Sequence, residues 1–103
     1  MAFHIYHRYG ECEPNPDVAC FDALYDELAA ADAEHSDVNV EHESGWGLGA
    51  YSSGLLVWEN VENGDQPRHM RSVARSRVLE LWRKLASGNL EAIESEPWQD
   101  GYG

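Results

Sequence analysis

Five histidines and two cysteines are the side chains in this sequence best suited to hold a metal ion. His4 and His7 lie three residues apart in a strand-like segment, so their side chains would point to opposite faces of a sheet. Seven residues separate Cys12 from Cys20, and no second closely spaced pair completes a tetrahedral site. The other histidines are isolated in the sequence: His35, His42 and His69. We therefore predict neither a metal site nor a cofactor.

No nucleophile stands in a recognisable catalytic motif. Residues 52–54 (Ser-Ser-Gly) lack the glycine two positions on each side of a serine that marks a nucleophile elbow. The glycines within residues 45–49 fall inside strand-like sequence rather than between a strand and a helix, so they form no phosphate-binding loop. Carboxylates are too numerous for any one pair to indicate acid–base catalysis. We predict a protein without enzymatic activity; a small hydrolase or transferase using a histidine with an acidic partner stays open as an alternative.

Charge is segregated along the chain. Fourteen Asp or Glu residues and no Lys or Arg lie between Tyr9 and Pro67, whereas six of the seven basic residues lie between Arg68 and Lys84. The net charge of −12 exceeds what solubility requires, and it costs stability through self-repulsion. Such a field can steer a basic protein partner into contact, and it would repel nucleic acid. An acidic surface without a specific partner is the simpler alternative.

The length of 103 residues suits one domain, residues 1–103, with a single core. No segment approaches the roughly 20 apolar residues of a membrane span, so we expect no membrane contact. The first nine residues lack the basic and then apolar pattern of a signal peptide, which favours the cytoplasm. In that compartment the two cysteines are expected to be reduced, although a disulfide between them is geometrically conceivable.

The strands that must position these side chains follow from hydrophobic periodicity. Alternating apolar and polar residues predict four strands, at residues 2–9, 38–43, 46–51 and 55–61. Residues 11–16 are expected to form a loop, because Pro14 and Pro16 cannot donate to a ladder. Residues 52–54 predict a short hairpin turn. Gly47 and Gly49 indicate a bulge or the close approach of another backbone.

Apolar residues at helical spacing predict two helices, at residues 16–33 and 72–86. Asn15 and Ser72 are the candidate N-caps, and Gly88 suits the left-handed position after the second helix. Residues 89–94 leave room for one further short turn. The order β-α-β-β-β-α predicts an α+β fold, a two-layer sandwich with two helices on one face of a mostly antiparallel four-stranded sheet. The expected buried residues are Leu24, Leu28, Val40, Val57, Leu81 and Leu85.

Eleven aromatic residues are many for one small core. Four of them lie on or next to predicted strands: Tyr6, Trp46, Tyr51 and Trp58. Aromatic residues at strand positions usually pack in the core. Some of these four are nevertheless expected on the sheet face away from the helices, beside Glu41 and Glu43. Aromatic anchors with neighbouring carboxylates suit a protein-binding surface.

Several segments together resemble a known protein family. They are residues 46–50 (Trp-Gly-Leu-Gly-Ala), 54–60 (Gly-Leu-Leu-Val-Trp-Glu-Asn), 67–70 (Pro-Arg-His-Met), 78–82 (Val-Leu-Glu-Leu-Trp), Gly88 and 97–98 (Pro-Trp). Over residues 18–98 the pattern is similar to the first-described immunity family of bacterial polymorphic toxin systems. The resemblance implies a cytoplasmic protein that binds and neutralises a cognate toxin domain, often a deaminase or nuclease. Its motifs contain no catalytic signature.

We accordingly expect a non-enzymatic immunity protein that binds a basic toxin domain, one that targets nucleic acid, through an acidic and aromatic surface. It would act as a monomer or weak homodimer. The candidate contact residues are Glu41, Glu43, Trp46, Trp58, Glu59, Glu62 and Asp65. Trp58 could equally belong to the core. A self-associating structural protein, in which the basic second helix of one copy meets the acidic half of another, stays open as an alternative.

The metal prediction can be checked directly on the purified protein. Because no histidines or cysteines are spaced as ligands on one face, elemental analysis should find less than stoichiometric zinc, copper or iron. One equivalent of zinc that survives dialysis against a chelator would contradict the prediction.

Overall fold

Seven strands form a single sheet in the computed structural model of this protein, which describes residues 3–7, 12–14, 20–30, 37–60, 62, 64 and 66–102. The strands are β1 (Phe3–Tyr6), β2 (Cys12–Pro14), β3 (Asp37–His42), β4 (Trp46–Tyr51), β5 (Leu56–Asn60), β6 (Arg68–Met70) and β7 (Gln99–Asp100). Their spatial order is β2-β1-β3-β4-β5-β6-β7, and every neighbouring pair is antiparallel.

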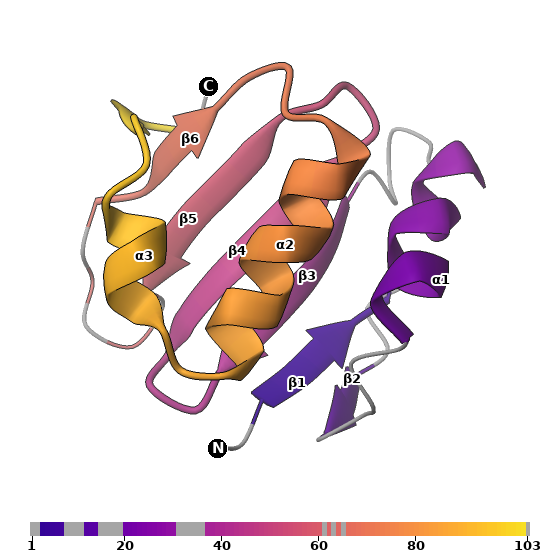
Figure 1. The fold of residues 1–103 in the computed structure, drawn as a ribbon, viewed down its shortest axis with the longest axis horizontal. Coiled ribbons are helices and arrows are strands. Elements are labelled where there is room, and N and C mark those ends of the chain that lie inside the picture. Colours follow the sequence, from indigo (N-terminus) through magenta and orange to yellow (C-terminus); the bar gives the residue numbers. More distant parts are fainter. Residues whose placement is uncertain are drawn as a thin grey trace.

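The helices form one layer against one face of this sheet (Figure 1). They are α1 (Phe21–Asp26), which continues into the 3₁₀ helix η2 (Glu27–Ala30), then α2 (Arg75–Ala86) and α3 (Leu90–Glu94). Helix α2 crosses β3 and β4, while α1 and α3 each contact α2. No helix in the described part of the chain is long and apolar enough to cross a membrane.

The core lies between α2 and the centre of the sheet. The indole Nε1 of Trp82 donates a hydrogen bond to the carbonyl oxygen of Leu48, at 3.0 Å, and so ties α2 to β4. The Phe21 ring packs against Trp82 on one side and Phe3 on the other, with centroid separations of 5.8 and 5.7 Å. The predicted burial is confirmed for all six residues: Leu24, Leu28, Val40, Val57, Leu81 and Leu85.

The α+β class and the antiparallel sheet with helices packed on it are confirmed, but the predicted number of four strands is wrong. Strands β2, β6 and β7 contain only two or three residues each, too few for alternation to be visible in the sequence. Strand β2 also falls in the segment predicted to be a loop. Its Pro14 is tolerated because β2 is an edge strand, where a missing N–H removes no bond from a second neighbour.

The two predicted helices can be compared with the structure only over the described residues. The described part of the first divides into α1 and η2, while residues 15–19 and 31–36, including the proposed cap Asn15, lie outside the described residues. The second helix begins at Arg75, because Ser72 has a φ of 56° and Ala74 is the N-cap. Gly88, with a φ of 83°, follows α2 as predicted, and the further short turn is α3.

Truncation of a central core residue should lower stability strongly. Leu81 is completely buried in α2, so Leu81→Ala should reduce the free energy of unfolding by about 2–5 kcal/mol, through lost apolar burial and a residual cavity. Urea unfolding measures this loss. Glu91→Ala, at an exposed position of α3, is the control and should stay within about 0.5 kcal/mol of the wild type. A loss at Leu81 no larger than that of the control would show that α2 is not part of the core.

Candidate functional site

The sheet face opposite the helices, here called the open face, gathers most of the acidic strand residues. Successive side chains of a strand point to opposite faces, and Ile5, Val40, Leu48 and Trp58 belong to the core beneath the helices. The strand residues that alternate with the core residues, and those paired with them on neighbouring strands, therefore define the open face. They are His4, Tyr6, Asp37, Asn39, Glu41, Gly47, Gly49, Tyr51, Val57, Glu59 and His69.

Two carboxylates flank a glycine at the centre of the open face. Glu41 of β3 is paired with Gly47 of β4, which is paired in turn with Glu59 of β5. Neighbouring strands lie about 4.8 Å apart, so the two glutamate backbones stand roughly 10 Å apart, and no side chain rises from the glycine between them. Two rows away on the same face, beyond the Asn39–Gly49 pair, Asp37 is paired with Tyr51. The register thus assembles three acids and a tyrosine that are far apart in the sequence.

The glycines of β4 make room for the side chain of Asn39. A Cβ added at Gly47 would lie 3.3 Å from both Oδ1 and Nδ2 of Asn39, which is tighter than ordinary van der Waals contact. The β3–β4 and β4–β5 registers run through both glycines without a bulge. The predicted bulge is therefore wrong, and the close neighbour of Gly47 is a side chain. The Oδ1 of Asn39 is buried and has no hydrogen-bond partner among the described residues.

Burial and neighbouring negative charges raise the pKa values of Asp37 and Glu41 on the open face. Burial raises the pKa of Asp37, and the charge of Glu59 raises it further, although a backbone hydrogen bond opposes both effects. Burial also raises the pKa of Glu41; His4 opposes this rise, while Glu62 and Glu59 add to it. The pKa of Tyr51 is raised by burial and by the charges of Asp37 and Glu59. These groups share one negative field.

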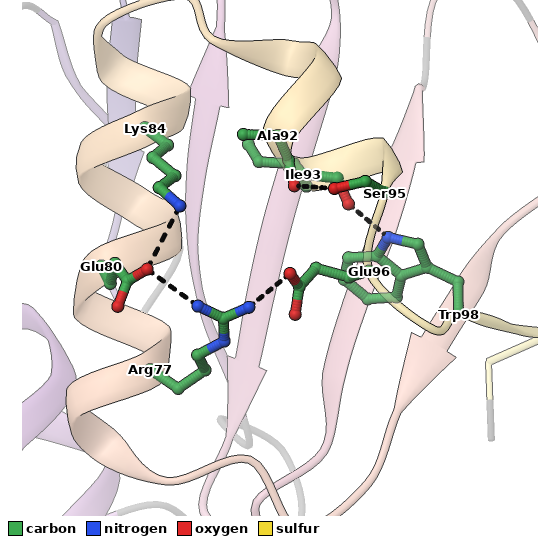
Figure 2. A network of polar contacts seen from close by, with 8 residues as sticks. All are labelled: Arg77, Glu80, Lys84, Ala92, Ile93, Ser95, Glu96 and Trp98. Carbon is green, nitrogen blue, oxygen red and sulfur yellow. Dashed lines mark hydrogen bonds and ion pairs between the residues drawn. The ribbon is translucent and has the colours of Figure 1, made fainter.

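Several acids on the helix side of the molecule have cationic partners within the chain. Figure 2 shows Arg77 of α2 between Glu80 and Glu96, with Lys84 on the far side of Glu80. The Arg77–Glu80 and Lys84–Glu80 separations are 2.8 and 3.2 Å. The charge of each carboxylate here is offset locally.

Two further arginines are engaged in the same way. Arg68 contacts Glu94 of α3 at 2.6 Å, and Arg75 lies 3.5 Å from Asp22 and 3.3 Å from Asp26. In contrast, no Lys or Arg of the described residues forms an ion pair with an open-face carboxylate, Asp37, Glu41 or Glu59. Among the described residues, the open face therefore carries three acids without an Arg or Lys partner.

The two tryptophans proposed as anchors lie on the helix side instead. Trp58 is 0% exposed, and its ring stacks between Trp46, at 4.4 Å, and Trp98, at 6.2 Å between centroids. Its Nε1 donates to Glu94 at 2.9 Å. Trp46 is half-buried against the core, with the Arg68 guanidinium 5.8 Å from its ring centroid. Trp58 cannot contact a partner in this fold, and Trp46 does not share a face with Glu41.

The other predicted contact residues fall in three places. Glu41 and Glu59 lie on the open face, as proposed for an acidic surface. Glu43 is exposed in the turn between β3 and β4, and Glu62 is exposed after β5, close enough for its charge to act on Glu41. Asp65 lies outside the described residues. The open face brings together four residues that we had not proposed as contacts: Asp37, Asn39, Tyr51 and Tyr102.

The C-terminal segment reaches the open face beside β5 and β6. The Tyr102 hydroxyl donates to Oε2 of Glu59 at 2.6 Å, and Nδ1 of His69 donates to the carbonyl oxygen of Gly101 at 2.9 Å. The hydrogen bond to Glu59 and the charge of that carboxylate raise the pKa of Tyr102. Alternation from Glu41 could have identified Asp37 and Asn39, whereas no local signal joins Tyr102 to Glu59, 43 residues away.

No metal centre is found in the part of the chain that the structure describes, and a serine–histidine contact in that part, Ser44 Oγ to His42 Nδ1 at 2.8 Å, lies in the β3–β4 turn, where the Ser44 N–H also donates to Nδ1. Among these residues, no three His, Cys, Asp or Glu side chains are placed to hold a metal ion. Two open hollows flank α1, with volumes of about 510 and 600 Å³, and neither lining pairs a nucleophile with a histidine base. The first is lined by Tyr25, Asp26, Leu28, Ala29 and Ser52, the second by Asp22, Ala74, Arg75, Ser76, Leu79 and Arg83.

Comparison of the chain with models of protein families, with curated proteins and with solved structures gave no match. The class that the fold and this surface define is an α+β domain whose sheet has one covered face and one acidic, tyrosine-bearing face.

Neutralising an open-face acid should stabilise the protein at neutral pH. A raised pKa means that the ionised form is less favourable in the folded than in the unfolded state, so the cost grows between the unfolded and the folded pKa and is complete above the folded pKa. Glu41→Gln should raise the free energy of unfolding at pH 7 by about 0.5 kcal/mol, a small value because solvent screens the site.

Urea unfolding of both proteins between pH 3 and pH 8 measures this difference. It should vanish below about pH 4, where the carboxyl group is protonated in both states. The control Glu80→Gln removes an acid whose pKa is lowered by Lys84 and Arg77, and it should not stabilise the protein at pH 7. A Glu41→Gln protein that is less stable than wild type at pH 7 would contradict the proposed repulsion.

Proposed function

We propose that this protein is a non-enzymatic inhibitor that binds a basic protein domain through the open face of its sheet. The proposal is supported most directly by one observation. Asp37, Glu41 and Glu59 share a face and form no ion pair with a described Lys or Arg, while five acids on the helix side form such pairs: Asp22, Asp26, Glu80, Glu94 and Glu96. Clustering like charges costs stability, and that cost is offset when a cationic partner binds.

The chemistry of the open face favours a protein partner over nucleic acid. A phosphate backbone would be repelled by this cluster, whereas lysine and arginine side chains would be attracted to it. Tyr6, Tyr51 and Tyr102 add aromatic surface beside the acids, and tyrosine is enriched in the centres of protein interfaces. The exposed Glu43 and Glu62 extend the negative charge toward the β3–β4 turn.

A toxin domain is the partner class that we propose. The segments at residues 46–50, 54–60, 67–70 and 78–82, with Gly88 and residues 97–98, resemble a bacterial immunity family, and toxins that act on nucleic acid need a basic cleft to hold phosphates. An acidic sheet face can cover such a cleft and occupy it with carboxylates in place of phosphates. The proposed site of action is the cytoplasm, where the toxin would otherwise reach its substrate.

Self-association through α2 has less support than it had from the sequence. Three of the four basic residues of α2, Arg75, Arg77 and Lys84, already contact acids of the same chain, so only Arg83 of this helix is left to meet the acidic face of a second copy. We therefore favour a monomeric inhibitor.

Reversing charge at the centre of the open face should abolish inhibition. A double variant, Glu41→Lys with Glu59→Lys, should lower affinity for the toxin domain encoded by the neighbouring gene by at least about 30-fold, since a loss of about 2 kcal/mol has that effect. Surface plasmon resonance measures the affinity, and survival of cells that co-express the toxin measures protection. Association with wild type should also slow steeply as salt rises above about 0.1 M.

The matched control is Glu91→Lys, which reverses an exposed acid on α3, on the helix side. It should bind and protect as wild type does. If the folded double variant also protects cells fully, the open face is not the binding surface. If the wild type binds no neighbouring toxin, the inhibitor proposal itself is wrong.

A further inference from the structure

We propose that residues 99–102 form a strap that opens and closes independently of the core, and that the closed strap is the form to which the basic partner binds. The second half of this inference rests on the proposed function, because it assigns Tyr102 and Glu59 to the binding surface. Two features carry the inference: the strap lies outside the core, and its Tyr102 hydroxyl is bonded to an acid of the open face.

The strap begins directly after Trp98, which is firmly anchored. The Trp98 Nε1 donates to the carbonyl oxygen of Ile93 at 2.7 Å (Figure 2), and its ring stacks on that of Trp58. The four residues of the strap are exposed or half-buried, and none of them belongs to the hydrophobic core. The chain therefore passes, within one residue, from a side chain held by packing to a segment held by polar contacts.

Polar contacts join the strap to the sheet. Its first two residues form β7, which pairs with β6 at the outer edge of the described sheet. The Gly101 N–H donates to the carbonyl oxygen of Pro67 at 2.8 Å, and the Gly101 carbonyl oxygen accepts from Nδ1 of His69. The Tyr102 hydroxyl donates to Glu59 at 2.6 Å. Hydrogen bonds next to solvent contribute a small net free energy, because water replaces them when they break, so the strap can open while the core stays folded.

Gly101 sets the direction of the chain after β7. Its φ is 90°, a conformation that residues with a Cβ rarely adopt. A Cβ added there would meet no atom of the described residues within 4 Å, apart from its chain neighbours. Alanine at this position would therefore strain the closed backbone without a steric clash. Gly101→Ala is for this reason a probe of strap closure.

Closure joins the strap to the proposed binding surface. In the closed form the Tyr102 ring, 58% exposed, stands beside the carboxylate to which its hydroxyl is bonded. In the open form the tyrosine leaves the open face, and Glu59 loses this contact. A partner that contacts both groups binds the closed form more tightly, and such a ligand shifts the equilibrium toward closure.

Native-state hydrogen exchange of the full chain, followed by NMR, tests the independent opening. The reporters are the amide of Gly101, which donates to Pro67, and the amide of the fully buried Trp82, in the interior of α2. Relative to unstructured peptides, Gly101 should be protected, but at least about 100-fold less than Trp82. Low urea should leave its protection unchanged, because strap opening exposes little surface, whereas the protection of Trp82 should fall.

Two outcomes of this experiment would overturn the strap. Protection of Gly101 that equals that of Trp82 and falls with urea in parallel would show that the segment opens only with the core. An unprotected Gly101 amide would show that the segment does not close.

Two variants test whether the strap closes as one unit. Tyr102→Phe deletes the hydrogen bond to Glu59 and should lower the protection of the Gly101 amide at least about threefold. Gly101→Ala should lower the protection of its own amide at least about fivefold. The control Tyr25→Phe removes a hydroxyl from α1, on the helix side, and should leave Gly101 within about twofold of wild type. An equal loss at Trp82 in both strap variants would show that they loosen the core, and would overturn the inference.

The toxin domain encoded by the neighbouring gene, at saturating concentration, tests the coupling to the partner. It should raise the protection of Gly101 at least about tenfold, because binding to the closed form opposes opening. Unchanged or lowered protection in a stable complex would overturn the coupling, while the inhibitor proposal stands. If no neighbouring toxin binds, the inhibitor proposal and the coupling both fail, whereas exchange in the free protein alone decides whether the strap opens.

Discussion

The structure depends on the burial of one face of an antiparallel sheet beneath a single layer of helices. Apolar residues of β3, β4 and β5 must meet α2 to form the core, and the Trp82–Leu48 hydrogen bond fixes where they meet. Successive side chains of a strand point to opposite faces of the sheet, so the residue next to one buried on the covered face lies on the open face. The burial of Val40 and Trp58 therefore places Glu41 and Glu59 on the open face together.

The same constraint explains the unequal distribution of charge between the two faces. Most basic residues of the chain fall in or near α2, and four of them contact acids on the helix side. Little cationic charge is left for the sheet, so the acids of β3 and β5 face one another across Gly47. Burial raises the pKa values of Asp37 and Glu41, and the charge of Glu59 raises both further, a cost in stability that a basic partner would offset.

The tryptophans lie on the helix side of the sheet, whereas several tyrosines lie on the open face. Trp46, Trp58 and Trp98 stack on the helix side, where Glu94 accepts from Trp58 and pairs with Arg68, so this group joins α3 to the sheet. Tyr51 and Tyr102 lie by the open-face acids. The tryptophans thus contribute stability, and the tyrosines contribute the aromatic part of the proposed binding surface.

The sequence by itself determined the α+β class, strands near β3, β4 and β5, most of α2, and the concentration of acids before Pro67, because these depend on local periodicity and composition. Only the tertiary structure decided the face of Trp58, since three consecutive apolar residues, Leu56 to Trp58, give no alternation to follow. It also decided the short strands β2, β6 and β7, whose residues are ordered by pairing with neighbouring strands. The meeting of Glu41, Glu59 and Tyr102 likewise depends on strand register and on a contact across 43 residues, neither of which is encoded in any local pattern.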